Sequence, residues 1–279
     1  MNKSQLIAHL CLIVSLCFPL ESSIQNIPQK DIKKIESFFE DLIKWHDFAY
    51  PIFGSKPMSL ADYNLKVPGQ LPFYKKIRSW FRLTKRKDQL EAWYKYKNEF
   101  ELNEFIFLDE EKDLFNCLAL ILINQKNMLQ LLKTHEAIFK EELGDSFTPE
   151  SFLETLKNRK LSLGQATKNN QKLLGIMLGY GVRNATLFQE RYHLMKKITQ
   201  GGLAEINELT DKLNRLEEQV GNFSELEEDA SISPLYFLAD RYHPETMTLK
   251  KQYELDRQNI EHMQQKPHFM DTVLQRLAI

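Results

Sequence analysis

The stretch Glu110 to Leu143, EEKDLFNCLALILINQKNMLQLLKTHEAIFKEEL, combines a long apolar run with a helical spacing of its large residues. Residues that recur three or four positions apart share one face of a helix. The residues that form this stripe are Leu114, Cys117, Leu118, Ile121, Leu122, Leu129 and Leu132. Gly144 follows at the usual place of a helix terminator. The stretch therefore predicts a helix over residues 110–143 and indicates a helical fold.

The same periodicity predicts helices along most of the chain. The expected segments are Ile32 to Ala49, a short helix from Ser59 to Tyr63, Phe73 to Phe100, about 149–158, Gly164 to Tyr180, Val182 to Ile198, Leu203 to Val220, Pro244 to Gln264 and Pro267 to Leu277. Only Glu104 to Asp109 (EFIFLD) leaves a strand open as an alternative. With 10 Gly and 10 Pro in 279 residues, a turn-rich β-sandwich is disfavoured. We expect an all-α protein: one multi-helix domain over residues 24–279 after an N-terminal signal segment, with at most one short strand pair.

The N-terminus has the layout of a secretory signal. Lys3 gives a positive start, Leu6 to Leu20 (LIAHLCLIVSLCFPL) carries no formally charged side chain, and Glu21-Ser22-Ser23 follows. The apolar run of 15 residues is shorter than the ~20 that a membrane-spanning helix needs. We predict a signal peptide over residues 1–23 and export across the inner membrane, to the periplasm, the cell envelope or the medium. A buried N-terminal helix and an uncleaved anchor remain as alternatives.

The cysteines add a second alternative for the N-terminus. Val14-Ser15-Leu16-Cys17 loosely resembles a bacterial lipobox, so the protein is a candidate lipoprotein, although Leu16 stands where a small residue is usual. We therefore rank cleavage near Ser23 first. Cys117 is the one cysteine after the signal segment, so no intramolecular disulfide is expected there.

Sequence signatures of catalysis are absent. The chain has no Gly-rich phosphate loop, no G-x-S-x-G phrase and no second histidine after His135-Glu136 at zinc-protease spacing. Its net charge of −1 gives no reason to expect a nucleic-acid partner. We assign no catalytic residue, expect neither a metal nor another cofactor, and expect a protein that acts by binding.

A basic cluster lies in the segment that follows Pro72. Its members, within thirteen residues, are Lys75, Lys76, Arg78, Arg82, Lys85, Arg86 and Lys87. Tyr74, Trp80 and Phe81 are interleaved with them, as in helices that contact anionic membrane surfaces. In the alternative, which we favour, the aromatic side chains face the core and the lysines lie along a solvated helix face.

Glycines punctuate the segment Leu173 to Ala185 (LLGIMLGYGVRNA). Gly175 and Gly179 are four residues apart, so they would share one helix face and admit a close neighbour. Gly181 would end the helix in a left-handed conformation. Arg183 and Asn184 would then open the next helix, where outward-pointing backbone N–H groups could hold an anion. A tight helical hairpin that uses glycine only for packing is the alternative.

Two phrases resemble a family. Tyr50 to Ser59 (YPIFGSKPMS) and Leu178 to Ala185 (LGYGVRNA) are similar to a pattern in uncharacterised exported proteins of chlamydia-like intracellular bacteria. Those proteins pair an aromatic-x-x-F-G-x-K-P phrase with an L-G-[YF]-G phrase that runs into a basic residue and Asn. The resemblance implies a cell-envelope or secreted location and supplies no activity.

The two phrases also define a candidate binding region. We expect the rigid loop at Gly54 to Pro57 to lie beside the glycine hairpin, with Lys56 and Arg183 presenting positive charge to one cleft. The candidate binding residues are Gly54, Lys56, Gly179, Tyr180, Gly181, Arg183 and Asn184. The first expectation for function is an envelope or secreted protein that binds a partner protein or lipid. The alternatives are an exported hydrolase or small-ligand-binding protein with its site in this region, and an effector that contacts a membrane through the basic cluster.

Overall fold

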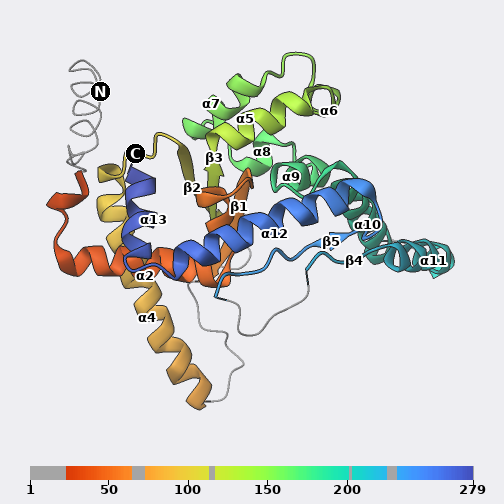
Figure 1. Ribbon diagram of the computed structural model, residues 1–279. Coiled ribbons are helices and arrows are strands. Elements are labelled where there is room, and N and C mark those ends of the chain that lie inside the picture. The colour runs from red at the N-terminus through yellow and green to blue at the C-terminus, as the bar shows by residue number, and fades with distance from the viewer. Residues whose placement is uncertain (1–22, 65–72, 113–116, 201–202, 225–230, 279) are drawn as a thin grey trace, which may run out of the picture.

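The computed structural model describes residues 23–64, 73–112, 117–200, 203–224 and 231–278 (Figure 1). The expected signal segment therefore lies outside the described residues, apart from Ser23, and its prediction is not tested by the fold.

A three-stranded antiparallel sheet lies at the centre of the molecule (Figure 1). Its strands are β1 (Met58–Asn64), β2 (Phe105–Lys112) and β3 (Cys117–Asn124), in the order β1-β3-β2. In the register, Ile121 of β3 lies between Leu60 of β1 and Leu108 of β2. Every residue of β3 is buried.

The sheet corrects three sequence expectations. The predicted helix over residues 110–143 is wrong in its first half, because β3 occupies that apolar run and helix α5 begins only at Gln125. The short helix expected from Ser59 to Tyr63 is part of β1, and the ambiguous Glu104 to Asp109 segment is almost wholly β2. A strand buried on both faces has a continuous apolar run instead of an alternating one, so its period does not distinguish it from a buried helix.

Most of the described chain is helical, as the sequence predicted. The helices are α2 (Gln29–Trp45), α3 (Ala49–Phe53), α4 (Phe73–Tyr96), α5 (Gln125–Thr134), α6 (Glu136–Leu143), α7 (Pro149–Lys157), α8 (Leu163–Ala166), α9 (Gln171–Met177), α10 (Val182–Gln200), α11 (Leu203–Gln219), α12 (Pro244–Gln264) and α13 (Phe269–Ala278), with 3₁₀ turns η1 (Ser23–Asn26) and η2 (Lys97–Glu99). A two-residue pair, β4 (Gly221–Asn222) with β5 (Leu238–Ala239), adds a second small sheet. The expectation of at most one short strand pair is therefore wrong, while the helical character is confirmed.

The sheet separates two hydrophobic cores. Alternate residues of β3 point to opposite faces, so Leu120 and Leu122 join one core while Ile121 and Ile123 join the other. The first core is aromatic and is covered by α2, α4, α12 and α13; Trp93 packs there against Phe38 and Phe107. The second is covered by α5 to α10. Each core needs β3, because β3 supplies a wall to both.

The loop between α3 and β1 is fixed at the edge where β3 passes into α5. Asn124 donates from its backbone to the Pro57 carbonyl (2.9 Å) and from its side chain to the Pro51 carbonyl (3.0 Å). Asn127, in the first turn of α5, donates to the Gly54 carbonyl (3.1 Å). Residues 54–57 are thereby held against the start of α5, and α12 runs across the molecule beside them (Figure 1).

Leu120→Ala and Ile121→Ala test the two-faced burial of β3. Each should lower the free energy of unfolding by about 2–5 kcal/mol, because each leaves a cavity in a different core. Leu255→Ala, at an exposed position of α12, should change it by less than about 0.5 kcal/mol. Urea denaturation measures all three; a small effect at either Leu120 or Ile121 would show that β3 faces only one core.

Candidate functional site

The two phrases of the candidate region lie side by side, as the sequence predicted. A Cβ built on Gly179 would stand 3.0 Å from Cδ of Pro57, and Nζ of Lys56 lies 5.6 Å from the centre of the Tyr180 ring. Tyr253 of α12 joins them by donating its hydroxyl to the Gly179 carbonyl (2.8 Å). The loop, the glycine turn and α12 therefore meet at one place.

Both backbone conformation and close packing require glycine at positions of this turn. Gly179 and Gly181 have positive φ angles of +77° and +82°, which side chains other than glycine rarely adopt. A Cβ on Gly175 would lie 2.9 Å from Cβ of Ala185, so α9 and α10 approach closely there. Gly179, however, lies beyond the end of α9 at Met177, so the expected helix face shared by Gly175 and Gly179 is wrong.

Lys56 does not face a cleft. Its side chain is fully buried and its ammonium pairs with Oδ2 of Asp47 (3.0 Å) while donating to the Met58 carbonyl. Burial lowers the pKa of Lys56, and the Asp47 carboxylate opposes that shift. The expectation that Lys56 presents charge to a ligand is wrong: the residue fastens the loop to the segment before α3.

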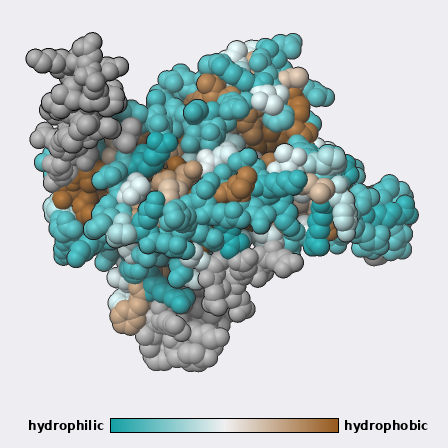
Figure 2. All heavy atoms as spheres, viewed as in Figure 1, coloured by the Kyte–Doolittle hydropathy of each residue, from teal (hydrophilic) through white to brown (hydrophobic). Residues whose placement is uncertain are grey.

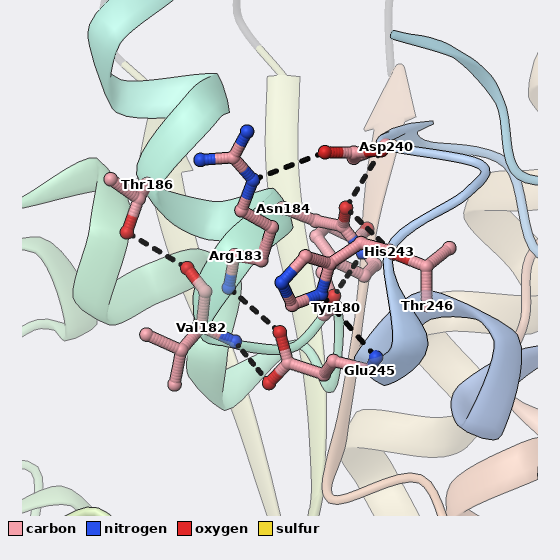
Figure 3. A network of polar contacts seen from close by, with 9 residues as sticks. All are labelled: Tyr180, Val182, Arg183, Asn184, Thr186, Asp240, His243, Glu245 and Thr246. Atoms are coloured by element: carbon pink, nitrogen blue, oxygen red, sulfur yellow. Dashed lines mark hydrogen bonds and ion pairs between the residues drawn. The ribbon is translucent and has the colours of Figure 1, made fainter. Parts of the chain in front are cut away.

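The N-terminus of α10 is likewise occupied from within the chain (Figure 3). The Glu245 carboxylate accepts hydrogen bonds from the backbone N–H groups of Val182 (2.9 Å) and Arg183 (2.8 Å). Arg183 extends its guanidinium to Asp240, with Nε 3.2 Å from Oδ2. The position where the sequence predicted an external anion is thus filled by a carboxylate of α12, and Arg183 is neutralised by Asp240.

Asn184 connects the turn to the chain before α12 (Figure 3). Its amide donates to the Tyr180 carbonyl (2.8 Å), and its Oδ1 accepts from the Asp240 backbone (2.9 Å) and the Thr246 hydroxyl (3.1 Å). The side chain is buried and every polar atom of its amide is engaged. Asn184 therefore has a structural role at the position where the sequence predicted a binding role.

Gly54 and Tyr180 also serve packing. A Cβ on Gly54 would lie 2.8 Å from Oδ2 of Asp256, the carboxylate that accepts from the backbone (2.8 Å) and hydroxyl (2.6 Å) of Ser55. The Tyr180 ring stacks on Phe237 with centroids 4.1 Å apart. Both residues therefore have a packing role.

A pocket of about 300 Å³ opens where these segments meet. The described residues that line it are Ser55, Pro57, Asn127, Gln130, Leu131, Thr134, His135, Ile176, Gly179, Gly181, Glu245, Leu249, Gln252 and Tyr253. Of the seven candidate binding residues, this lining includes Gly179 and Gly181. The sequence analysis did not identify the lining residues of α5 and α12. The periodicity of a helix shows which of its faces is apolar, but it does not show which distant loop its polar face contacts. His135-Glu136 was considered only as a zinc motif, and no sequence signal singled out Glu245.

The pocket has an acidic character. Its described lining includes the Glu245 carboxylate and contains no Lys or Arg. Burial lowers the pKa of His135, and the Glu245 carboxylate only opposes this shift, so the imidazole is neutral at pH 7. The arrangement suits a ligand that donates hydrogen bonds or carries positive charge, the opposite of the anion that the sequence suggested.

The basic cluster lies on α4, which contributes no residue to the described lining of the pocket. The side chains of Lys75, Lys76 and Arg78 lie outside the described part of the chain. Arg82, Lys85, Arg86 and Lys87 are exposed or half-buried. Trp80 and Phe81 are 58% and 64% exposed, so the interpretation in which these rings face the core is wrong.

Neither a family model, nor a curated protein sequence, nor a solved structure matches the chain. The resemblance to exported proteins of chlamydia-like bacteria therefore stays a prediction. Among the described residues, no group of three or more His, Cys, Asp or Glu side chains is placed to hold a metal ion. In the same residues, no helix has both the length and the apolar character that crossing a membrane requires.

Lys56→Met and Arg183→Ala separate a structural from a binding role. Lys56→Met keeps the volume but leaves Asp47 and the Met58 carbonyl without their donor. Breaking an ion pair whose two partners are both buried costs about 3–5 kcal/mol. Because Asp47 keeps some solvent contact, Lys56→Met should lower the free energy of unfolding by about 2–3 kcal/mol. Arg183→Ala removes a half-exposed ion pair and should cost about 0–1 kcal/mol. Urea denaturation of both variants is the measurement, and equal effects would contradict the assignment.

Proposed function

We propose that the protein is an exported binding protein for a small cationic molecule, held in the pocket between the Ser55–Pro57 loop, α5, the Gly179–Gly181 turn and α12. The observation that carries this proposal is the meeting of a carboxylate, neutral polar groups and an aromatic ring around one open pocket, with no Lys or Arg in its described lining.

The size and lining of the pocket support small-molecule binding. A volume of about 300 Å³ lies at the lower end of the range for ligand sites, which are mostly apolar with a few placed polar groups. Here Leu131, Ile176 and Leu249 give the apolar surface. Glu245 and Gln252 supply hydrogen-bond acceptors. A compact amine fits this combination better than an extended chain.

The walls of the pocket are held in place before any ligand arrives. Three hydrogen bonds cross between its segments: Asn127 to the Gly54 carbonyl, Ser55 to Asp256, and Tyr253 to the Gly179 carbonyl. A preformed site avoids the entropy cost of ordering its walls on binding. The fixed walls support a ligand-binding role for the pocket over an incidental gap between packed helices.

Charge supports a cationic ligand. Glu245 accepts two backbone N–H groups and Asp256 accepts from Ser55 and Gln252, yet within the described residues no ion pair neutralises either carboxylate. Tyr253 adds an aromatic ring, which attracts cations through its electron-rich face. An anion in the pocket would meet the Glu245 carboxylate, and the Asp256 carboxylate lies behind Ser55 of the lining.

The geometry favours binding over hydrolysis. In the described lining of the pocket, the residue to consider as a serine nucleophile is Ser55. Its hydroxyl donates to the Asp256 carboxylate at 2.6 Å. A serine nucleophile is instead activated by a base such as histidine that takes its proton. We therefore propose a binding role and assign no catalytic residue.

Ligand-induced stabilisation tests the pocket. The probes are small amines, choline and putrescine, with citrate as the anionic comparator. A probe at a hundred times its Kd should raise the free energy of unfolding by about 2.7 kcal/mol, seen as a higher Tm. Gln130→Trp fills the rim of the pocket and should abolish the rise, whereas Gln258→Trp, the same change at an exposed site of α12 outside the lining, should retain it. The proposal fails if citrate stabilises and the amines do not, or if Gln130→Trp still responds.

Export is tested separately. We expect the mature chain to begin near Ser23 or Ile24, because the small residues after the apolar run provide the cleavage site. Intact-mass measurement of the protein from soluble and membrane fractions of its native cells checks this. A chain that starts at Cys17 with added acyl mass would establish a lipoprotein, and an uncut chain in the cytosol would exclude export.

A further inference from the structure

Helix α4 carries a surface that the pocket does not use. Its second half packs on the aromatic core through Leu90 and Trp93, while its first half extends away from the body of the molecule (Figure 1). The end of α2 lies beside this projecting part. We call a set of exposed side chains of both elements, together with the half-buried Arg86, the α4 surface; its members are Lys44, Trp45, Trp80, Phe81, Arg82, Lys85 and Arg86.

Three large aromatic rings are exposed on this surface. Trp45, Trp80 and Phe81 have 62%, 58% and 64% of their area open to solvent. Trp80 and Phe81 contact each other edge to face, with ring centres 5.3 Å apart and planes at 74°. The side of the molecule seen in Figure 2 is mostly hydrophilic, so aromatic exposure of this extent needs a reason.

Basic groups line a groove beside one of the rings, Trp45. Arg82, Lys85 and Arg86 form, with Trp45 and Asp41, the described lining of a groove of about 360 Å³ between α4 and α2. Arg86 is held by its position over the Tyr63 ring, 5.2 Å from the ring centre. Within the described part of the chain, no carboxylate lies at ion-pair distance from Arg82, Lys85 or Arg86. Positive charge is therefore concentrated on a projecting, aromatic part of a nearly neutral protein.

We propose that the α4 surface docks on a bilayer that contains anionic lipids. Trp80 and Phe81 enter the interface between headgroups and acyl chains, where amphipathic and apolar rings are favoured. Arg82, Lys85 and Arg86 lie at the depth of the phosphate groups, and the groove beside Trp45 receives one headgroup. The association is peripheral and reversible, because it depends on a few rings and on charge.

The geometry favours a bilayer over a nucleic acid. Proteins that bind single strands offer flat ring faces on which successive bases stack. Trp80 and Phe81 instead pack against each other at 74°, which makes a compact wedge with a shared apolar end. A wedge with basic groups behind it is complementary to a charged surface with an apolar interior.

Vesicle sedimentation of the full-length protein tests the proposal. The vesicles are phosphatidylcholine alone, or phosphatidylcholine with 30% phosphatidylglycerol, in ~0.1 M and ~0.5 M NaCl, across which the screening length falls severalfold. We expect binding to the anionic vesicles at the lower salt, with affinity about tenfold weaker at the higher salt or on neutral vesicles.

Matched variants locate the contact. Arg82→Glu with Lys85→Glu should weaken binding at least tenfold, whereas Lys196→Glu with Lys197→Glu, the same charge change on the exposed face of α10, should leave it within about twofold. Trp80→Ala with Phe81→Ala should also weaken it about tenfold, and Phe188→Ala with Tyr192→Ala, two exposed rings of α10, should not. Circular dichroism checks that each variant is folded.

Three results would overturn the proposal. Equal binding to neutral and anionic vesicles would show that charge does not contribute to the association. Equal losses of vesicle binding in the α4 and α10 variants would show that the α4 surface is not the contact site. Release from the vesicles by 10 mM inorganic phosphate or by a single-stranded oligonucleotide, at constant ionic strength, would assign the groove to a soluble phosphate or a nucleic acid. None of these outcomes bears on the amine pocket, which lies on other elements.

Discussion

The burial of β3 on both faces is the constraint from which the rest of the arrangement follows. A strand with neither face in water must be covered twice, so the chain places aromatic residues of α2 and α4 on one side and the helices α5 to α10 on the other. Antiparallel neighbours on both edges satisfy its backbone hydrogen bonds. Because β3 passes directly into α5, fixing the strand also fixes the helix that forms one wall of the pocket.

Some helix ends were predictable for local reasons, although the expected helix from Gly164 to Tyr180 is divided into α8 and α9. Pro149 after Thr148, Pro244 after His243 and Gly144 after Leu143 are start and stop signals that act through the backbone, and the helices begin and end there. The central strand was not predictable, since Cys117 to Ile123 carries no alternation to separate it from a buried helix. Distinguishing the two depended on knowing that both faces would be covered, which is a property of the whole chain.

The candidate site shows a similar division between location and chemistry. The two phrases around Gly54 and Gly179 meet, so the turn residues correctly indicated the place. Their charges were misjudged, because Lys56 and Arg183 each have a carboxylate partner that lies elsewhere in space. A basic side chain beside a loop indicates an anion site only if no carboxylate of the same chain already pairs with it. Here Asp47 and Asp240 pair with the two basic side chains, and the Glu245 carboxylate makes the pocket acidic where a basic one was expected.

The hydrogen bonds between Ser55 and Asp256 join residues 201 positions apart. During synthesis at roughly 5–20 residues per second, the loop that carries Ser55 would wait about 10–40 seconds for α12 to appear. A chain that ended before α12 would keep the sheet residues but lack the carboxylate that shapes the loop and the one that caps α10. The pocket can therefore form only after residues 244–256 have been made, so it is completed later than the sheet on which its walls rest.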